Sequence, residues 1–129
     1  MKASYVMKHR VLFNAAAMFN LAAGIPLLVA PGFMASLLAL EITPAGTLFM
    51  QLTALAIVGF GIIYGLIARD PLRHRPYILL GVALKLAFVG FVYTYWLRGH
   101  IGGLLPLLAV GDVIFGVLFL LAYRKIRAK

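Results

Sequence analysis

Four long apolar runs constrain the fold of this chain more than any other feature. Each contains about 20 residues, at roughly 11–30, 47–68, 77–97 and 101–123. A helix rises 1.5 Å per residue, so about 20 residues are needed to cross ~30 Å of hydrocarbon. Membrane β-strands are about half that length and alternate with period two, which these runs do not. The sequence therefore predicts an all-α, polytopic membrane protein, with residues 1–129 forming a single bundle of four transmembrane helices.

The composition favours lipid rather than water as the solvent. Hydrophobic residues make up 64% of the chain and charged residues 12%, whereas soluble domains have roughly 45–50% and about 25%. A net charge of +9 would suggest nucleic acid in a soluble protein, but so few charges on so apolar a chain indicate a membrane. We expect no nucleic-acid partner. The chain has no cysteine, so it has no disulfide framework and no thiolate metal site.

Prolines and glycines mark the breaks between the runs. Pro31-Gly32 ends the first run and Pro44-Ala45-Gly46 precedes the second, so residues 33–41 are predicted to form a short interfacial helix. The connector 69–76 is basic and contains two prolines, which is typical of a tight polar turn. The third connector has only residues 98–100, which makes the last two spans antiparallel neighbours.

Small residues and prolines also occur inside the spans. Gly61 and Gly65 form a GxxxG pair, which is compatible with packing inside the chain or with a homodimer seam. Pro26 and Pro106 are compatible with kinks that open a cavity or with plain packing. The sequence leaves both pairs of alternatives open.

The basic residues predict the orientation. Because cytoplasmic loops carry an excess of Lys and Arg, the side that holds ten of the twelve basic residues is expected to be cytoplasmic, with both termini on it. Anionic lipid headgroups are the expected partners of these charges, and a multi-pass protein of a bacterial inner membrane is the expected location. The ten residues are Lys2, Lys8, Arg10, Arg69, Arg73, Arg75, Arg124, Lys125, Arg127 and Lys129.

Lys85 and Asp112 are the only two full charges deep in the spans. Counted from Gly99 in the short third connector, Lys85 lies 14 residues back and Asp112 lies 13 residues forward. At 1.5 Å per residue both lie about 20 Å below the turn, so two antiparallel neighbours place them at matching depth. Pairing is the obvious way to lower the cost of a charge in lipid. We expect the two to meet, in an apolar and aromatic bed.

The other candidate site residues are Asn14 and Asn20 in the first span, Gln51 in the second and Trp96 in the third. One interpretation is a polar network between the helices that fixes their register. The other is a site that binds a ligand head group or carries protons, with the charged pair as its ligand or coupling groups. The sequence does not decide between them.

Known catalytic and cofactor patterns find no counterpart. All three histidines lie at span ends or in connectors, so no imidazole pair is placed to ligate a haem in the bilayer. There is no second intramembrane Asp for an aspartyl protease, no phosphate-binding loop and no metal-spaced cluster. Small multidrug exporters carry a membrane Glu in the first helix that is missing here. We expect no catalytic residues, no metal and no cofactor.

Two short elements carry a resemblance. Phe19-Asn20-x3-Gly24 lies early in the chain and Gly111-Asp112-x3-Gly116 lies late, within four spans that cover nearly the whole length. In these features the chain resembles small bacterial inner-membrane proteins of DoxX-like size and topology. The resemblance implies the four-helix fold and carries over no active site.

The functional expectation is an integral membrane accessory or scaffolding protein. It would pack against a membrane-protein partner, or against a hydrophobic small molecule such as a lipid or quinone. The alternative is a small dimeric, proton-coupled transporter that uses Lys85 or Asp112 as its coupling group. A membrane enzyme ranks third.

Overall fold

The computed structural model describes the backbone of residues 2–127 and the side chains of residues 7–126. Its five helices are α1 (Lys2–Val29), α2 (Pro31–Leu37), α3 (Pro44–Arg69), α4 (Arg75–Leu97) and α5 (Leu104–Arg127). Four of them contain segments long and apolar enough to cross a membrane: Met7–Val29, Pro44–Arg69, Arg75–Leu97 and Leu104–Ile126. The prediction of an all-helical chain with four candidate spans is confirmed, and the chain has the character of a multi-pass membrane protein.

Local capping explains where α3 begins. The Thr43 side chain accepts a hydrogen bond from the backbone N–H of Gly46 (2.9 Å), and Pro44 occupies the first helical turn, where its missing N–H costs nothing. The helix therefore starts three residues before the predicted boundary at 47. At its other end, Asp70 accepts a hydrogen bond from the backbone N–H of Arg73 (3.2 Å), which closes the turn into α4.

The two other connectors differ from the predicted boundaries. The short helix α2 begins at Pro31 rather than 33 and ends at Leu37 rather than 41, because Ala39 adopts a left-handed φ of 57° that stops the helix. The last span begins at Leu104 rather than 101, after a loop in which Gly99 has a φ of 80°. Pro106 consequently lies in the first turn of α5, where a proline removes no helical hydrogen bond. Pro106 therefore gives no reason to expect a kink in α5.

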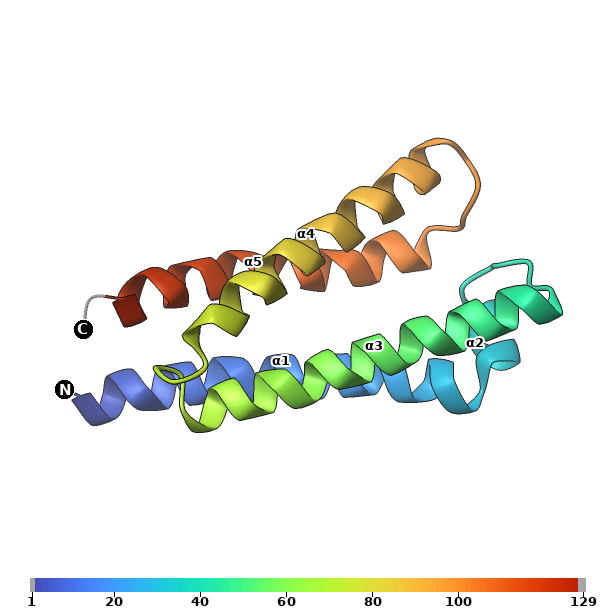
Figure 1. The fold of residues 1–129 in the computed structure, drawn as a ribbon. Helices are drawn as coiled ribbons and strands as arrows, with labels where there is room; N and C mark the ends of the chain where they lie inside the picture. The colour runs from blue at the N-terminus through green and yellow to red at the C-terminus, as the bar shows by residue number, and fades with distance from the viewer. Residues whose placement is uncertain (1, 128–129) are drawn as a thin grey trace.

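The long helices form two antiparallel pairs, α1 with α3 and α4 with α5 (Figure 1). The short α4–α5 loop makes the last two helices neighbours, as predicted. The two described chain ends lie at the same end of the bundle as the α3–α4 turn (Figure 1). The α2–α3 and α4–α5 loops lie at the opposite end, where Gly102 approaches Ala39.

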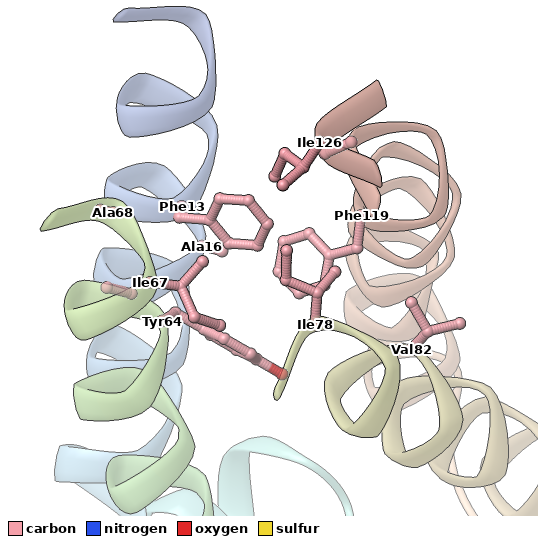
Figure 2. Close-up of a cluster of buried hydrophobic side chains, with 11 residues drawn as sticks. Phe13, Ala16, Tyr64, Ile67, Ala68, Ile78, Val82, Phe119 and Ile126 are labelled. Atoms are coloured by element: carbon pink, nitrogen blue, oxygen red, sulfur yellow. The ribbon is translucent and has the colours of Figure 1, made fainter. Parts of the chain in front are cut away.

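A hydrophobic core joins the two pairs near the end that carries the chain termini (Figure 2). Phe13 of α1, Tyr64 of α3, Ile78 of α4 and Phe119 of α5 are all fully buried in it. The Phe13 and Phe119 rings stack with centroids 4.7 Å apart, and Tyr64 meets Phe119 edge-on at 5.0 Å. In lipid such contacts hold helices together by van der Waals packing rather than by the hydrophobic effect. The polar site lies deeper in the bundle, beside this core.

Candidate functional site

The site is centred on Lys85, halfway along α4, whose side chain is only 5% exposed. Its Nζ donates a hydrogen bond to Oδ1 of Asp112 on α5, at 2.5 Å. Asp112 is 14% exposed. The matched depth counted from the α4–α5 connector thus corresponds to a direct ion pair between these two helices.

Asn20 extends the ion pair to the other pair of helices. The Lys85 Nζ also donates to Oδ1 of Asn20 (3.3 Å), and the Asn20 Nδ2 donates to the backbone carbonyl of Ile57 on α3 (3.0 Å). Gly61 permits this approach, since a Cβ there would lie 3.2 Å from the Asn20 Cβ. One connected set of polar contacts therefore links all four long helices. We call Lys85, Asp112 and Asn20 the polar triad.

Four aromatic rings surround the ammonium group. The Lys85 Nζ lies 5.4 Å from the ring centroid of Tyr64, 5.5 Å from Phe19, 5.7 Å from Phe115 and 6.0 Å from Phe119. These distances fall within the range in which a ring face attracts a cation. The triad and these rings together stabilise a charged lysine where water is scarce.

Glycines make room for two of these rings. A Cβ at Gly81 would lie 3.0 Å from the Tyr64 ring, and one at Gly111 would lie 2.7 Å from the Phe19 ring. The sequence predicted aromatic surroundings for the charged pair but did not identify Phe19 and Tyr64 as partners of the lysine. The sequence signal for these contacts was Gly81 and Gly111. A glycine in a helix indicates that another group packs closely against it, but it does not identify that group.

The remaining predicted site residues lie outside the triad. Gln51 donates from Nε2 to the backbone carbonyl of Leu28 (3.0 Å) and so ties α3 to the last turn of α1. Trp96 lies in the last turn of α4, is 42% exposed and meets Tyr93 edge-on at 5.8 Å. Asn14 is exposed on the outer side of α1. The structure thus brings together three of the six candidate residues.

The end of the bundle that carries the chain termini is basic. Arg75 lies over the Tyr123 ring, with its Cζ 3.6 Å from the centroid, and donates from Nε to the Tyr123 carbonyl (3.4 Å). This contact fixes the start of α4 against the end of α5. The other basic side chains described at this end are exposed: Lys8, Arg10, Arg69, Arg73, Arg124 and Lys125.

The chemistry available in the triad is that of one ammonium, one carboxylate and one amide. Among the residues that the structure describes, no three His, Asp or Glu side chains are grouped so that they could hold a metal ion. The triad can fix the register of four helices, or it can exchange a proton or a polar ligand at Asp112, the most exposed of its charged groups.

Comparison with protein-family models, with curated proteins and with solved structures gives no match to this chain. The resemblance to DoxX-like proteins therefore remains a prediction from the sequence.

Proposed function

We propose that the chain is an integral membrane accessory protein of a bacterial inner membrane that packs against a membrane-protein partner or a hydrophobic small molecule such as a lipid or quinone. The observation that carries this proposal is the contrast between the interior and the outer faces. The members of the polar triad contact one another and the Ile57 carbonyl within the chain, while large apolar side chains are exposed on each long helix, such as Val29, Phe49, Phe91 and Leu107.

In this proposal the triad is a structural lock. Lys85 and Asp112 hold α4 to α5, and Asn20 carries the contact across to α1 and α3. A locked bundle presents its outer side chains in fixed positions, which suits a protein that acts as a packing surface. Both chain ends and the exposed basic residues of that end of the bundle face the cytoplasm, where they meet anionic headgroups.

Site-specific photo-crosslinking in intact cells tests this function. A photoreactive residue replaces Phe91, which is 70% exposed on α4. In a matched control it replaces Ile78, which is fully buried on the same helix. We expect a discrete adduct, identified by mass spectrometry, from position 91 and none from position 78. Adducts with bulk phospholipid alone, from position 91 and from equivalent outward positions on the other helices, would contradict the accessory role.

A second candidate function, a dimeric proton-coupled transporter, has one specific observation in its favour. Asp112 is 14% exposed, against 5% for Lys85, and within the described residues only its Oδ1 accepts a hydrogen bond. The other carboxylate oxygen is therefore available to a proton or a polar ligand. Proton-coupled flux into proteoliposomes that is lost in Asp112→Asn, with the fold retained, would favour the transporter; equal flux in the variant would remove it.

A further inference from the structure

The outer face of α1 carries a polar residue in an apolar stripe. Met7, Val11, Met18 and Ile25 are 46–66% exposed, and the exposed Asn14 lies between the second and third of them. The spacings of three, four and seven residues place all five on one side of the helix. The opposite side of α1 is buried and contains Phe13, Ala16, Ala17 and Asn20.

Asn14 differs from Asn20 and Gln51, the other two amide side chains of the spans, because its amide has no hydrogen bond within the described part of the chain. Asn20 and Gln51 donate to carbonyls of a neighbouring helix. The exposed hydroxyls of Thr53 and Thr94 donate to carbonyls of their own helices. An amide in hydrocarbon without a partner is costly, since no water is there to replace it. The outer face of α1 is therefore incomplete in the isolated chain.

We propose that a second copy of this chain completes it, with the two α1 helices side by side and the Asn14 amides hydrogen-bonded to each other. A carboxamide has both a donor and an acceptor, so it is complementary to itself across a two-fold axis. Copies inserted in the same orientation hold Asn14 at the same depth. The exposed Ala15 and Ala22 flank this stripe and permit close approach of the two backbones.

The position of Asn14 argues for a protein partner rather than a lipid headgroup. It lies four residues beyond Arg10, the last basic residue before the apolar run, and so about 6 Å further along the helix. Lys8 and Arg10 are exposed nearer the start of α1 and are the groups that meet headgroup phosphates. An asparagine at one position of an apolar seam is also a known means of fixing the register of two helices. The dimer rests on the membrane insertion assumed in the proposed function, but not on the accessory role.

Fluorescence energy transfer between labelled copies in liposomes tests the proposal. We expect the wild-type chain to dimerise and Asn14→Leu to dimerise about 3- to 30-fold more weakly, the range for polar contacts between membrane helices. Asn14→Gln keeps the amide and is expected to retain most of the affinity. Thr53→Val removes a hydroxyl that bonds only its own helix and serves as the matched control. A monomeric wild-type chain, or equal affinity in Asn14→Leu, would overturn the dimer.

Disulfide trapping locates the seam, and the absence of native cysteines makes each introduced one unique. We expect Met18→Cys to crosslink two copies in membranes and Phe91→Cys, on α4, not to do so. The reverse pattern would place the contact elsewhere and refute the α1 seam. Asn14→Leu should leave the free energy of unfolding of the monomer unchanged, because the amide makes no hydrogen bond with the residues that the structure describes. If the dimer forms but the photoreactive residue at position 91 gives no specific adduct, the accessory role is refuted and the dimer is not.

Discussion

The Lys85 ammonium depends on several groups at once, which makes its response to mutation diagnostic. Lys85→Leu leaves the Asp112 carboxylate buried without a counterion, and Asp112→Leu leaves the ammonium with only an amide and the rings. Each single change should lower the free energy of unfolding by about 3 kcal/mol or more, as for other buried pairs that lose one partner. The Lys85→Leu/Asp112→Leu double variant should lose much less, because no charge remains unpaired.

Unfolding titrations in mixed micelles measure this comparison. If the double variant were as unstable as the sum of the single ones, the pair would not be coupled. If it were fully folded yet inactive in a physiological assay, the triad would be functional rather than a structural lock, which would favour the transporter.

The residue scale also shows what a sequence can predict about such a site. The Lys85–Asp112 contact followed from counting, because a short loop fixes the relative depth of the two helices on either side of it. The contact of Lys85 with Asn20 did not, because α1 and α4 are joined through α2 and α3 and no count fixes their relative rotation. Tyr64 was missed for the same reason, since its ring reaches Lys85 from α3.

At the scale of the helices, two glycines of α3 form a matched pair for substitution. A Cβ at Gly61 would lie 3.2 Å from the Asn20 Cβ and 3.3 Å from the Ala17 carbonyl, whereas a Cβ at Gly65 would meet nothing within 4 Å. Gly61→Leu should therefore lower the free energy of unfolding by about 1–3 kcal/mol, by forcing α1 and α3 apart. Gly65→Leu, measured by the same titration, should have little effect. An equal cost at both positions would mean that the whole GxxxG pair lies in a helix contact.

A second prediction at this scale concerns the end of α1. The Leu28 carbonyl lies in the last helical turn, where backbone acceptors lack partners of their own, and Gln51 supplies one from α3. Gln51→Leu should cost about 1 kcal/mol of unfolding free energy. Thr53→Val on the same helix should cost almost nothing, because that hydroxyl bonds Phe49 within α3. Equal costs would show that the Gln51 contact adds no stability.

Element boundaries were predicted less well than the elements themselves. The apolar runs located all four candidate spans because crossing a lipid bilayer requires a minimum length of helix. The ends depended on local chemistry that hydropathy does not contain. The Thr43 cap moved the start of α3, and the backbone turn at Ala39 moved the end of α2.

For the whole molecule, the proposed topology can be tested with single cysteines. Leu72 is 57% exposed in the α3–α4 turn, and Gly103 lies in the α4–α5 loop, where an added side chain would meet nothing within 4 Å. We expect a membrane-impermeant thiol reagent added outside intact spheroplasts to label Gly103→Cys but not Leu72→Cys. The opposite labelling would invert the orientation inferred from the basic residues.

The short α4–α5 loop also bears on biogenesis. Lys85 and Asp112 both belong to the α4–α5 hairpin and are separated by 27 residues. Lys85 is therefore synthesised first and has no counterion until Asp112 has left the ribosome. The two can neutralise each other within the hairpin before it docks onto α1 and α3. If the chain inserts into a membrane as proposed, a nascent chain that stops short of Asp112 presents an unpaired ammonium to the insertion machinery, and the integration of α4 then depends on the helix that follows it.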